Sequence, residues 1–365
     1  MTGDRPKGET GRGRRRILIY RLGSLGDTVV SLPCFHLVAR AFPDAERRVL
    51  TNVPVSAKAA PLELVLGDSG LIHGIMRHPI GLRRPGDILA LARAIRAYKP
   101  DCLIYMTEPH GPMAVWRNHA FFRLCGIPRI VGVPLGDLAA PRYLPARGRW
   151  EYEAERLALC LDELGDAELD NAASWDLHFT PAEESAAAAT LRDWPGSNNY
   201  AGFSIGAKID VKDWGDANWR AVLETTGAER PGLGLAIVGS ADEAARSDAL
   251  AAHWPGPVVN LCGKVSPRVS ALVLRGARLF FGHDSGPMHL AAAVGTPTVP
   301  VFSARVKPGV WFPYGDVHRV HYHRTPCFDC HLDVCRDYDK TCIRLIRPED
   351  VAGSIRALLG GEAGR

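Results

Sequence analysis

Short apolar segments alternate with helical patterns along almost the whole chain. The first segment, residues 17–20, is followed by a glycine-containing loop, a helical pattern that ends near residue 42, and a second apolar segment at 48–51. A strand, loop, helix and strand in this order form the unit of a parallel sheet covered by helices. The order therefore predicts an α/β fold.

The same succession begins again in the second half of the chain. Apolar segments at residues 202–205 and 235–238 each end in a glycine, and a helical pattern follows both. Further strands are expected at residues 258–261, 279–281 and 298–302. Between the halves, residues 165–174 are small and acidic, so we place a linker near 165–180. The second half is therefore also expected to form a doubly wound sheet.

We divide the 365 residues into four parts. They are a disordered basic arm at 1–16, an N-terminal domain at 17–172, a C-terminal domain at 173–347 and a C-terminal helix at 348–365, which is expected to cross back to the N-terminal domain. The last helix has Pro348 in its first turn and glycines just past its end, which is typical of helix boundaries. Two such domains in succession indicate a cleft, because ligands of these sheets bind beyond the carboxyl ends of strands.

Charge is concentrated in the arm. Six basic minus two acidic side chains in residues 1–16 give +4, which equals the formal net charge of the whole chain. The remainder is neutral, which argues against nucleic-acid binding, because such proteins usually carry a basic face on their folded part. The arm is expected to be a solvated tail, or alternatively to be attracted weakly to an anionic membrane face.

The loop after the first strand ends in a carboxylate. Gly23 and Gly26 permit a tight turn, and Asp27 stands at the start of the next helix. One interpretation is that Asp27 only caps the helix, where Asp is favoured. The other is that its carboxylate accepts a proton from an attacking hydroxyl.

A second candidate site lies between an expected strand and an Ala-rich helix. Ser285 and Gly286 would begin this helix, leaving free N–H groups and a positive dipole end that suit a pyrophosphate. His289, in the first turn, could donate to a phosphate oxygen. The alternative is a capped helix with a surface histidine.

Two further strand ends carry charged side chains. Lys212 could reach a phosphate as a point charge, or it could be a solvated loop lysine. Glu243 suits ribose hydroxyls, or it merely favours its helix N-terminus. No Gly-x-Gly-x-x-Gly occurs in the loop before Glu243, which argues against a dinucleotide dehydrogenase.

Four of the nine cysteines are clustered near the C-terminus, at Cys327, Cys330, Cys335 and Cys342. Four thiols at this spacing can surround one tetrahedral metal, zinc or alternatively iron. Free thiols are the other interpretation. Since the cluster follows both sheets, such a metal would be structural rather than catalytic.

Two segments together resemble glycosyltransferase family 9, the ADP-heptose:lipopolysaccharide heptosyltransferases. They are Arg21-Leu22-Gly23-Ser24-Leu25-Gly26-Asp27 and Asp284-Ser285-Gly286-Pro287-Met288-His289. The resemblance covers roughly residues 16–360. It implies the GT-B fold, in which two Rossmann-like domains face a cleft, with the acceptor on the first domain and the nucleotide sugar on the second. It also implies an inverting transfer that needs no catalytic metal or other cofactor.

On matching positions, the resemblance implies that Asp27 is the general base, that Lys212 binds phosphate and that Glu243 lies near the nucleoside. The donor-phosphate loop would be Asp284, Ser285, Gly286 and His289, and the acceptor loop Arg21, Gly23, Ser24 and Gly26. Ala207 and Lys208 stand where small hydroxyl residues are common, and the arm and the cysteine cluster are not general features of the family.

The resemblance implies a cytoplasmic enzyme of lipopolysaccharide core or related surface-glycan assembly, with the arm as a contact to the inner face of the inner membrane. Some relatives that glycosylate proteins carry a cysteine-bound iron, so a protein acceptor stays open. The sequence is also compatible with a GT-B transferase that uses another nucleotide sugar, with a sugar-nucleotide epimerase, and with a non-catalytic partner protein. No nucleic-acid partner is expected.

Overall fold

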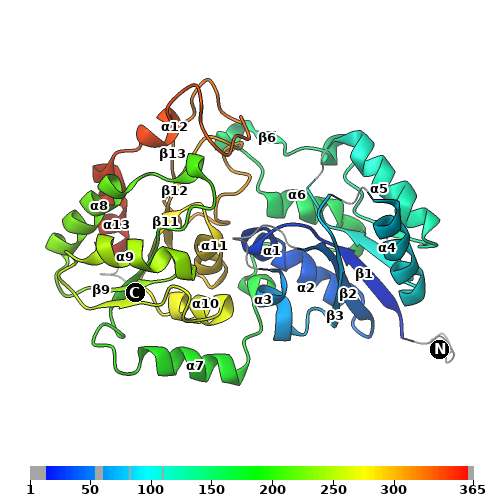
Figure 1. The fold of residues 1–365 in the computed structure, drawn as a ribbon, viewed down its shortest axis with the longest axis horizontal. Coiled ribbons are helices and arrows are strands. Elements are labelled where there is room, and N and C mark those ends of the chain that lie inside the picture. Colours follow the sequence, from blue (N-terminus) through cyan, green and yellow to red (C-terminus); the bar gives the residue numbers. More distant parts are fainter. Residues whose placement is uncertain (1–13, 54–60, 82–83, 109–110, 361–365) are drawn as a thin grey trace, which may run out of the picture.

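The computed structural model describes residues 14–53, 61–81, 84–108 and 111–360, and it contains the two expected parallel sheets (Figure 1). The first sheet has the strand order β3-β2-β1-β4-β5, and the second has the order β10-β9-β8-β11-β12-β13. Every pairing within these two sheets is parallel. The α/β class with two doubly wound sheets is confirmed. Residues 1–13 of the predicted arm lie outside the described residues.

The first sheet is formed by residues 16–131. Its strands are β1 (Arg16–Tyr20), β2 (Glu46–Asn52), β3 (Gly74–His78), β4 (Cys102–Tyr105) and β5 (Ile130–Val131). Its helices are α1 (Leu25–Val30), α2 (Leu32–Ala41), α3 (Glu63–Leu66), α4 (Pro85–Tyr98) and α5 (Pro112–Leu124); the hairpin β6 (Tyr143–Leu144) and β7 (Arg149–Trp150) and helix α6 (Glu153–Cys160) follow. Ile17, Leu18 and Ile19 in central β1 are fully buried, because helices cover both faces of the sheet.

The second sheet is formed by residues 200–322. Its strands are β8 (Tyr200–Ser204), β9 (Gly234–Ile237), β10 (Val258–Asn260), β11 (Phe280–His283), β12 (Thr298–Phe302) and β13 (His321–Tyr322). The helices of this half are α7 (Pro181–Leu191), α8 (Asp216–Glu229), α9 (Ala244–Ala251), α10 (Pro267–Arg275), α11 (Gly286–Ala293), α12 (Thr341–Arg344) and α13 (Pro348–Gly360). The domain boundary at 172/173 stays a prediction.

The C-terminal helix lies elsewhere than expected. We expected it to cross back to the first domain, but α13 packs along α8 and against β12 in the second half (Figure 1). The physical reason is its apolar side, on which Val351, Ile355 and Leu359 are buried in the core beside the second sheet. In the described part of the chain, no helix is long and apolar enough to cross a membrane.

The two sheets meet through the N-termini of α1 and α11, which lie side by side at the centre of the molecule (Figure 1). An ideal Cβ placed on Gly26 would lie 2.8 Å from Cδ2 of His289, and one placed on Gly286 would lie 2.8 Å from Cδ2 of Leu25. Only glycine permits this approach of the two helices. The beginnings of two helices therefore face one another across the boundary between the sheets.

A buried arginine links the two halves away from this contact. Arg268 of α10 is 4% exposed and donates to the carbonyl oxygens of Val65 in α3 and of Leu177 and His178 in the linker. It also donates to the carboxylate of Glu183 in α7 at 2.5 and 3.0 Å. These hydrogen bonds hold the pKa of Glu183 at about 2. The side chain of Arg268 therefore holds α10, α3, the linker and α7 together at the junction.

Replacing Arg268 by Ala should lower the free energy of unfolding by about 3–5 kcal/mol, because it leaves the buried carbonyl groups without this donor and Glu183 without its ion-pair partner. Urea denaturation measures this loss. The matched control is Arg275→Ala on the same helix, whose ion pair with Glu184 is exposed and should contribute about 0.5 kcal/mol or less. Equal losses in both variants would contradict the assigned role of Arg268.

Candidate active site

Asp27 occupies the third position of α1, and one of its two carboxylate oxygens closes the loop before the helix. Oδ2 accepts hydrogen bonds from the backbone N–H of Ser24 at 2.6 Å and from its hydroxyl at 2.7 Å. Within the described residues, Oδ1 accepts none. Asp27 therefore takes part in capping α1 through Oδ2, as one of the two interpretations expected, and its Oδ1 stays available to a ligand.

The structure places Arg21 behind Asp27 rather than in the cleft. Its side chain is 1% exposed; it donates from Nη1 to the carbonyl of Met106 at 2.7 Å and from Nη2 to the carbonyl of Asp27. In this structure the side chain of Arg21 supports the backbone at Asp27, and the assignment of residues 21–26 as the acceptor loop stays a prediction. Gly23 has φ +122°, and a Cβ there would lie 2.6 Å from Cβ of Asp27, so the turn requires glycine.

The N-terminus of α11 presents an unsatisfied polar end. Ser285 is the N-cap residue, yet its hydroxyl makes no capping hydrogen bond. Its Oγ is buried, and it has no partner in the part of the chain that the structure describes. Buried hydroxyl groups normally have a partner, and the first backbone N–H groups of a helix favour anions. These features fit a phosphate group at this helix end.

Lys212 is not a solvated loop lysine. It lies in the short 3-10 helix η6 (Asp210–Lys212), and its ammonium is 2.5 Å from Oδ2 of Asp284, a residue only 6% exposed. Asp284 directly precedes the N-cap residue of α11. The ion pair therefore holds a positive charge next to the start of this helix.

His289 is buried rather than at the surface, because its ring packs against Gly26 of α1. This burial lowers the pKa of His289 to about 4, although the nearby carboxylates of Asp284 and Asp27 act in the opposite direction. The imidazole is therefore neutral near pH 7 and has one N–H to donate. The structure thus brings together Asp27, Asp284, His289 and Lys212 from both halves of the chain.

Glu243 lies at a neighbouring strand end, in the 3-10 helix η7 (Ala241–Glu243). Its Oε2 accepts from the backbone N–H of Ser240 at 2.9 Å. An ideal Cβ on Gly206 or Gly239 would lie 2.9 or 2.3 Å from a Glu243 carboxylate oxygen. The carboxylate therefore lies over the carboxyl ends of β8 and β9, beyond which ligands of such sheets bind.

Lys208 is a candidate residue whose role the sequence did not indicate. It is half-buried in the loop after β8, and burial lowers its pKa. The negative charge of Asp27 acts against this shift, while the positive charge of Lys212 adds to it. Lys208 therefore supplies a second cation close to Asp27 and Lys212. The signal in the sequence was a lysine in place of a small hydroxyl residue.

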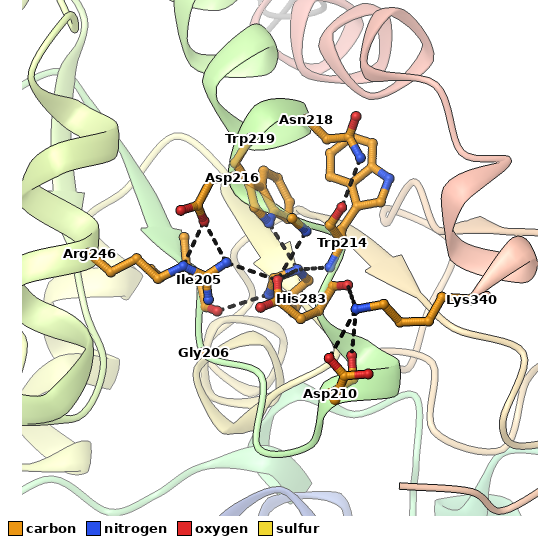
Figure 2. A network of polar contacts seen from close by, with 12 residues as sticks. Ile205, Gly206, Asp210, Trp214, Asp216, Asn218, Trp219, Arg246, His283 and Lys340 are labelled. Carbon is orange, nitrogen blue, oxygen red and sulfur yellow. Dashed lines mark hydrogen bonds and ion pairs between the residues drawn. The ribbon is translucent and has the colours of Figure 1, made fainter. Parts of the chain in front are cut away.

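His283 is a second residue whose role was missed, and Figure 2 shows its surroundings. Its Nε2 accepts from the backbone N–H of Trp214 and from the indole N–H of Trp219, both at 2.9 Å. Two donors at Nε2 require the proton on Nδ1, which donates to the carbonyl of Ile205 at 2.9 Å. Complete burial lowers the pKa of His283 to about 4, so the ring stays neutral.

The loop that carries Lys212 is held from both sides of this histidine (Figure 2). Arg246 of α9 donates to Asp213 at 3.0 Å, and Lys340 contacts the carboxylate of Asp210 at 3.1 Å. These contacts hold the loop to α9 and to the residue before α12, while His283 holds it to the ends of β8 and β11. This network therefore positions Lys212.

The four clustered cysteines do not form a metal site in this structure. Among the described residues, no group of three or more His, Cys, Asp or Glu side chains is placed so that it could hold a metal ion. Cys342 is buried in α12 against the core beside the second sheet, whereas Cys327, Cys330 and Cys335 are half-buried in the preceding loop. The prediction of a structural zinc or iron is therefore not supported by the geometry.

Comparison with known proteins decides the family. The model of "Glycosyltransferase family 9 (heptosyltransferase)" matches residues 151–337. The chain belongs to this family. A similar curated protein is lipopolysaccharide heptosyltransferase 1 of Pseudomonas aeruginosa, 32% identical over 180 residues, 44% of this chain and 48% of the relative. The chain spans about half or less of the length of the curated relatives that it matches.

Solved structures support the fold of this family 9 chain over nearly its whole length. A glycosyl transferase family 9 structure from Veillonella parvula superposes with a TM-score of 0.71 at 17% identity and covers 95% of this chain and 98% of its own. The E. coli heptosyltransferase WaaC with ADP gives a TM-score of 0.62 at 19% identity, and the superposition covers 94% of this chain and 99% of WaaC. The expected GT-B fold is confirmed.

The stability of this family 9 protein should fall as the pH drops from about 6.5 toward 4. Between pH 6.5 and 4, the unfolded chain binds a proton at His283 and the folded chain does not. The stabilisation contributed by His283 is therefore fully present above pH 6.5 and is lost as the pH falls toward 4. This contribution of His283 to the free energy of unfolding is at most about 3 kcal/mol.

The variant His283→Gln lacks this pH-dependent contribution to the free energy of unfolding. The difference in free energy of unfolding between wild type and variant should therefore narrow as the pH falls from 6.5 to 4, as measured by urea denaturation at a series of pH values. His253→Gln, at an exposed position, is the control and should keep the wild-type dependence. If the difference in free energy of unfolding between the wild type and His283→Gln does not change with pH, His283 titrates normally in the folded protein.

Proposed function

We propose that this protein transfers a heptose from ADP-heptose to an acceptor hydroxyl. The observation that supports the proposal best is the meeting of Asp27, Lys212, Asp284 and His289 at the facing starts of α1 and α11. Family membership and the names of similar proteins, which are lipopolysaccharide heptosyltransferases, favour a heptose donor and a lipopolysaccharide acceptor. In the form implied by the family, the transfer inverts the anomeric carbon and needs no catalytic metal.

The donor diphosphate would lie at the N-terminus of α11. The first backbone N–H groups and the unpartnered hydroxyl of Ser285 would donate to its oxygens. Lys212 and Lys208 would offset its negative charge, and neutral His289 would donate one further hydrogen bond. Glu243, over the ends of β8 and β9, would accept from the ribose hydroxyls.

In the reaction, the acceptor oxygen forms a bond to the anomeric carbon while the bond from that carbon to the phosphate oxygen breaks. The proton of the hydroxyl passes to Oδ1 of Asp27, and ADP leaves with the bonding electron pair. The leaving group gains negative charge, which the helix end and the two lysines stabilise. Ser24 holds the carboxylate of Asp27 through its backbone N–H and its hydroxyl, and Arg21 holds the backbone carbonyl of the same residue. Such an enzyme would act in the cytoplasm at the inner face of the inner membrane.

The donor assignment is tested by calorimetric titration of the full chain with ADP and with UDP. We expect ADP to bind more tightly than UDP. Lys212→Ala should weaken ADP binding about tenfold or more, because a charge-assisted contact to phosphate is lost. Lys264→Ala removes an exposed lysine whose ammonium donates to the carbonyl of Asn260, and this change should leave ADP binding unchanged.

The remaining outcomes of this titration assign a different function. A preference for UDP would keep the GT-B fold and replace the donor. If neither nucleotide binds, the chain is a non-catalytic partner protein and the proposed transfer is wrong.

Replacing Asp27 by Asn should lower the transfer rate about 10²–10⁴-fold, the usual contribution of a general base, because the amide cannot accept the proton. The amide oxygen still accepts from Ser24, so the fold and the affinity for ADP should be retained. The rate is measured with ADP-heptose and a heptose-deficient lipopolysaccharide acceptor. Asp87→Asn, at the equivalent position of α4, is the control. Undiminished transfer by Asp27→Asn would leave this residue with the role of a helix cap only.

A further inference from the structure

The solvent-facing side of α5 is unusually apolar. Met113 is 87% exposed, Trp116 58% and Leu124 75%, whereas Val115 and Phe122 of the same helix are buried. These three residues are three, eight and eleven positions apart, spacings that place them on one face of a helix, opposite the buried pair. Single exposed apolar residues are ordinary, but several large ones on one face of a helix mark an interaction site.

Positive charge accompanies this patch. Arg117 and Arg123 are exposed on the same face of α5, and Arg93 and Arg96 are exposed on the neighbouring helix α4. Arg96 donates to the carbonyl of Leu124 at 2.9 Å, which joins the two helices. Between them, α4 and α5 contain one acidic residue, Asp87. We call the exposed side of these two helices the α4–α5 surface.

We propose that the α4–α5 surface docks the protein on an anionic lipid bilayer. Tryptophan favours the boundary between lipid head groups and acyl chains, and arginine is attracted to anionic head groups. A helix that carries both on one face can lie in the plane of the interface with its apolar side chains inserted. A second copy of this chain fits less well, because a symmetric contact through this surface would bring arginines against arginines.

The chain enters the fold beside this surface. Arg16 donates from its side chain to the carbonyl of Tyr98, the last residue of α4, and from its backbone to the carboxylate of Asp101. Arg16 therefore adds positive charge at the end of α4, with the same sign as that of the α4–α5 surface.

The surface is also connected to the candidate active site. Helix α5 follows the carboxyl end of β4, where the carbonyl of Met106 accepts from Arg21, the residue that supports Asp27. Docking through α5 would bring this edge of the first sheet close to the bilayer. A lipid-linked acceptor could then reach Asp27 without leaving the membrane. This last step rests on the proposed function, whereas the docking does not.

Sedimentation of the full chain with lipid vesicles tests the docking. We expect binding to vesicles of phosphatidylcholine mixed with phosphatidylglycerol, weak binding to phosphatidylcholine alone, and a decrease as salt is raised. The triple variant Met113→Ser, Trp116→Ser and Leu124→Ser should bind the anionic vesicles about tenfold or more weakly, because its apolar side chains no longer leave water. The control replaces three exposed apolar residues of the second half, Val317→Ser, Val334→Ser and Leu345→Ser, and should bind like the wild type.

Affinity for ADP, measured on the same proteins, separates docking from the proposed function. Normal ADP binding by the α5 variant together with lost vesicle binding supports the proposal. Equal vesicle binding by the α5 variant and the wild type would overturn it. So would a wild-type dimer that dissociates in the α5 variant while neither protein binds vesicles, because a second copy would then be the partner.

Discussion

The contact between the starts of α1 and α11 is the constraint on which the candidate site depends. A Cβ atom on Gly26 would clash with the ring of His289, and one on Gly286 with the side chain of Leu25, so each helix packs a side chain directly onto a glycine of the other. The helix end that attracts an anion and the helix that carries Asp27 are thereby held in one place. Arg268 supports the same arrangement from the opposite side of the junction.

Burial at this contact sets the charges of the site. His289 and His283 are both neutral because burial lowers the pKa of each imidazole, and each ring then has a single N–H to donate. The charged groups that remain are two lysines, Lys208 and Lys212, and the carboxylates of Asp27 and Asp284. These four nearly cancel without a ligand. A bound diphosphate would be attracted by the lysines and the helix end, while Asp27 stays available to the acceptor.

Much of the fold could be predicted from local sequence, but the supporting contacts could not. Strand β12 was predicted with its observed bounds, because a short, mostly apolar run between turns favours a strand buried on both faces. Asp27, Lys212 and Asp284 were found because they follow strand ends. The roles of Arg21 and His283 depend on partners 85 and 64 residues away, Met106 and Trp219, which no local pattern reveals. The spacing of the four cysteines suggested a metal site, but among the described residues no three of these side chains are placed to hold a metal ion.

Helix α5 was missed for a reason that also gives it a function. A surface helix normally has one apolar side, and that periodicity is what identifies it in a sequence. In α5 the apolar residues occur on both sides, with Val115 and Phe122 in the core and Met113, Trp116 and Leu124 in solvent, so the helical period is weak. Such a pattern is typical of a helix with two apolar neighbours. The described residues supply one of them, the first sheet, and a bilayer would supply the other.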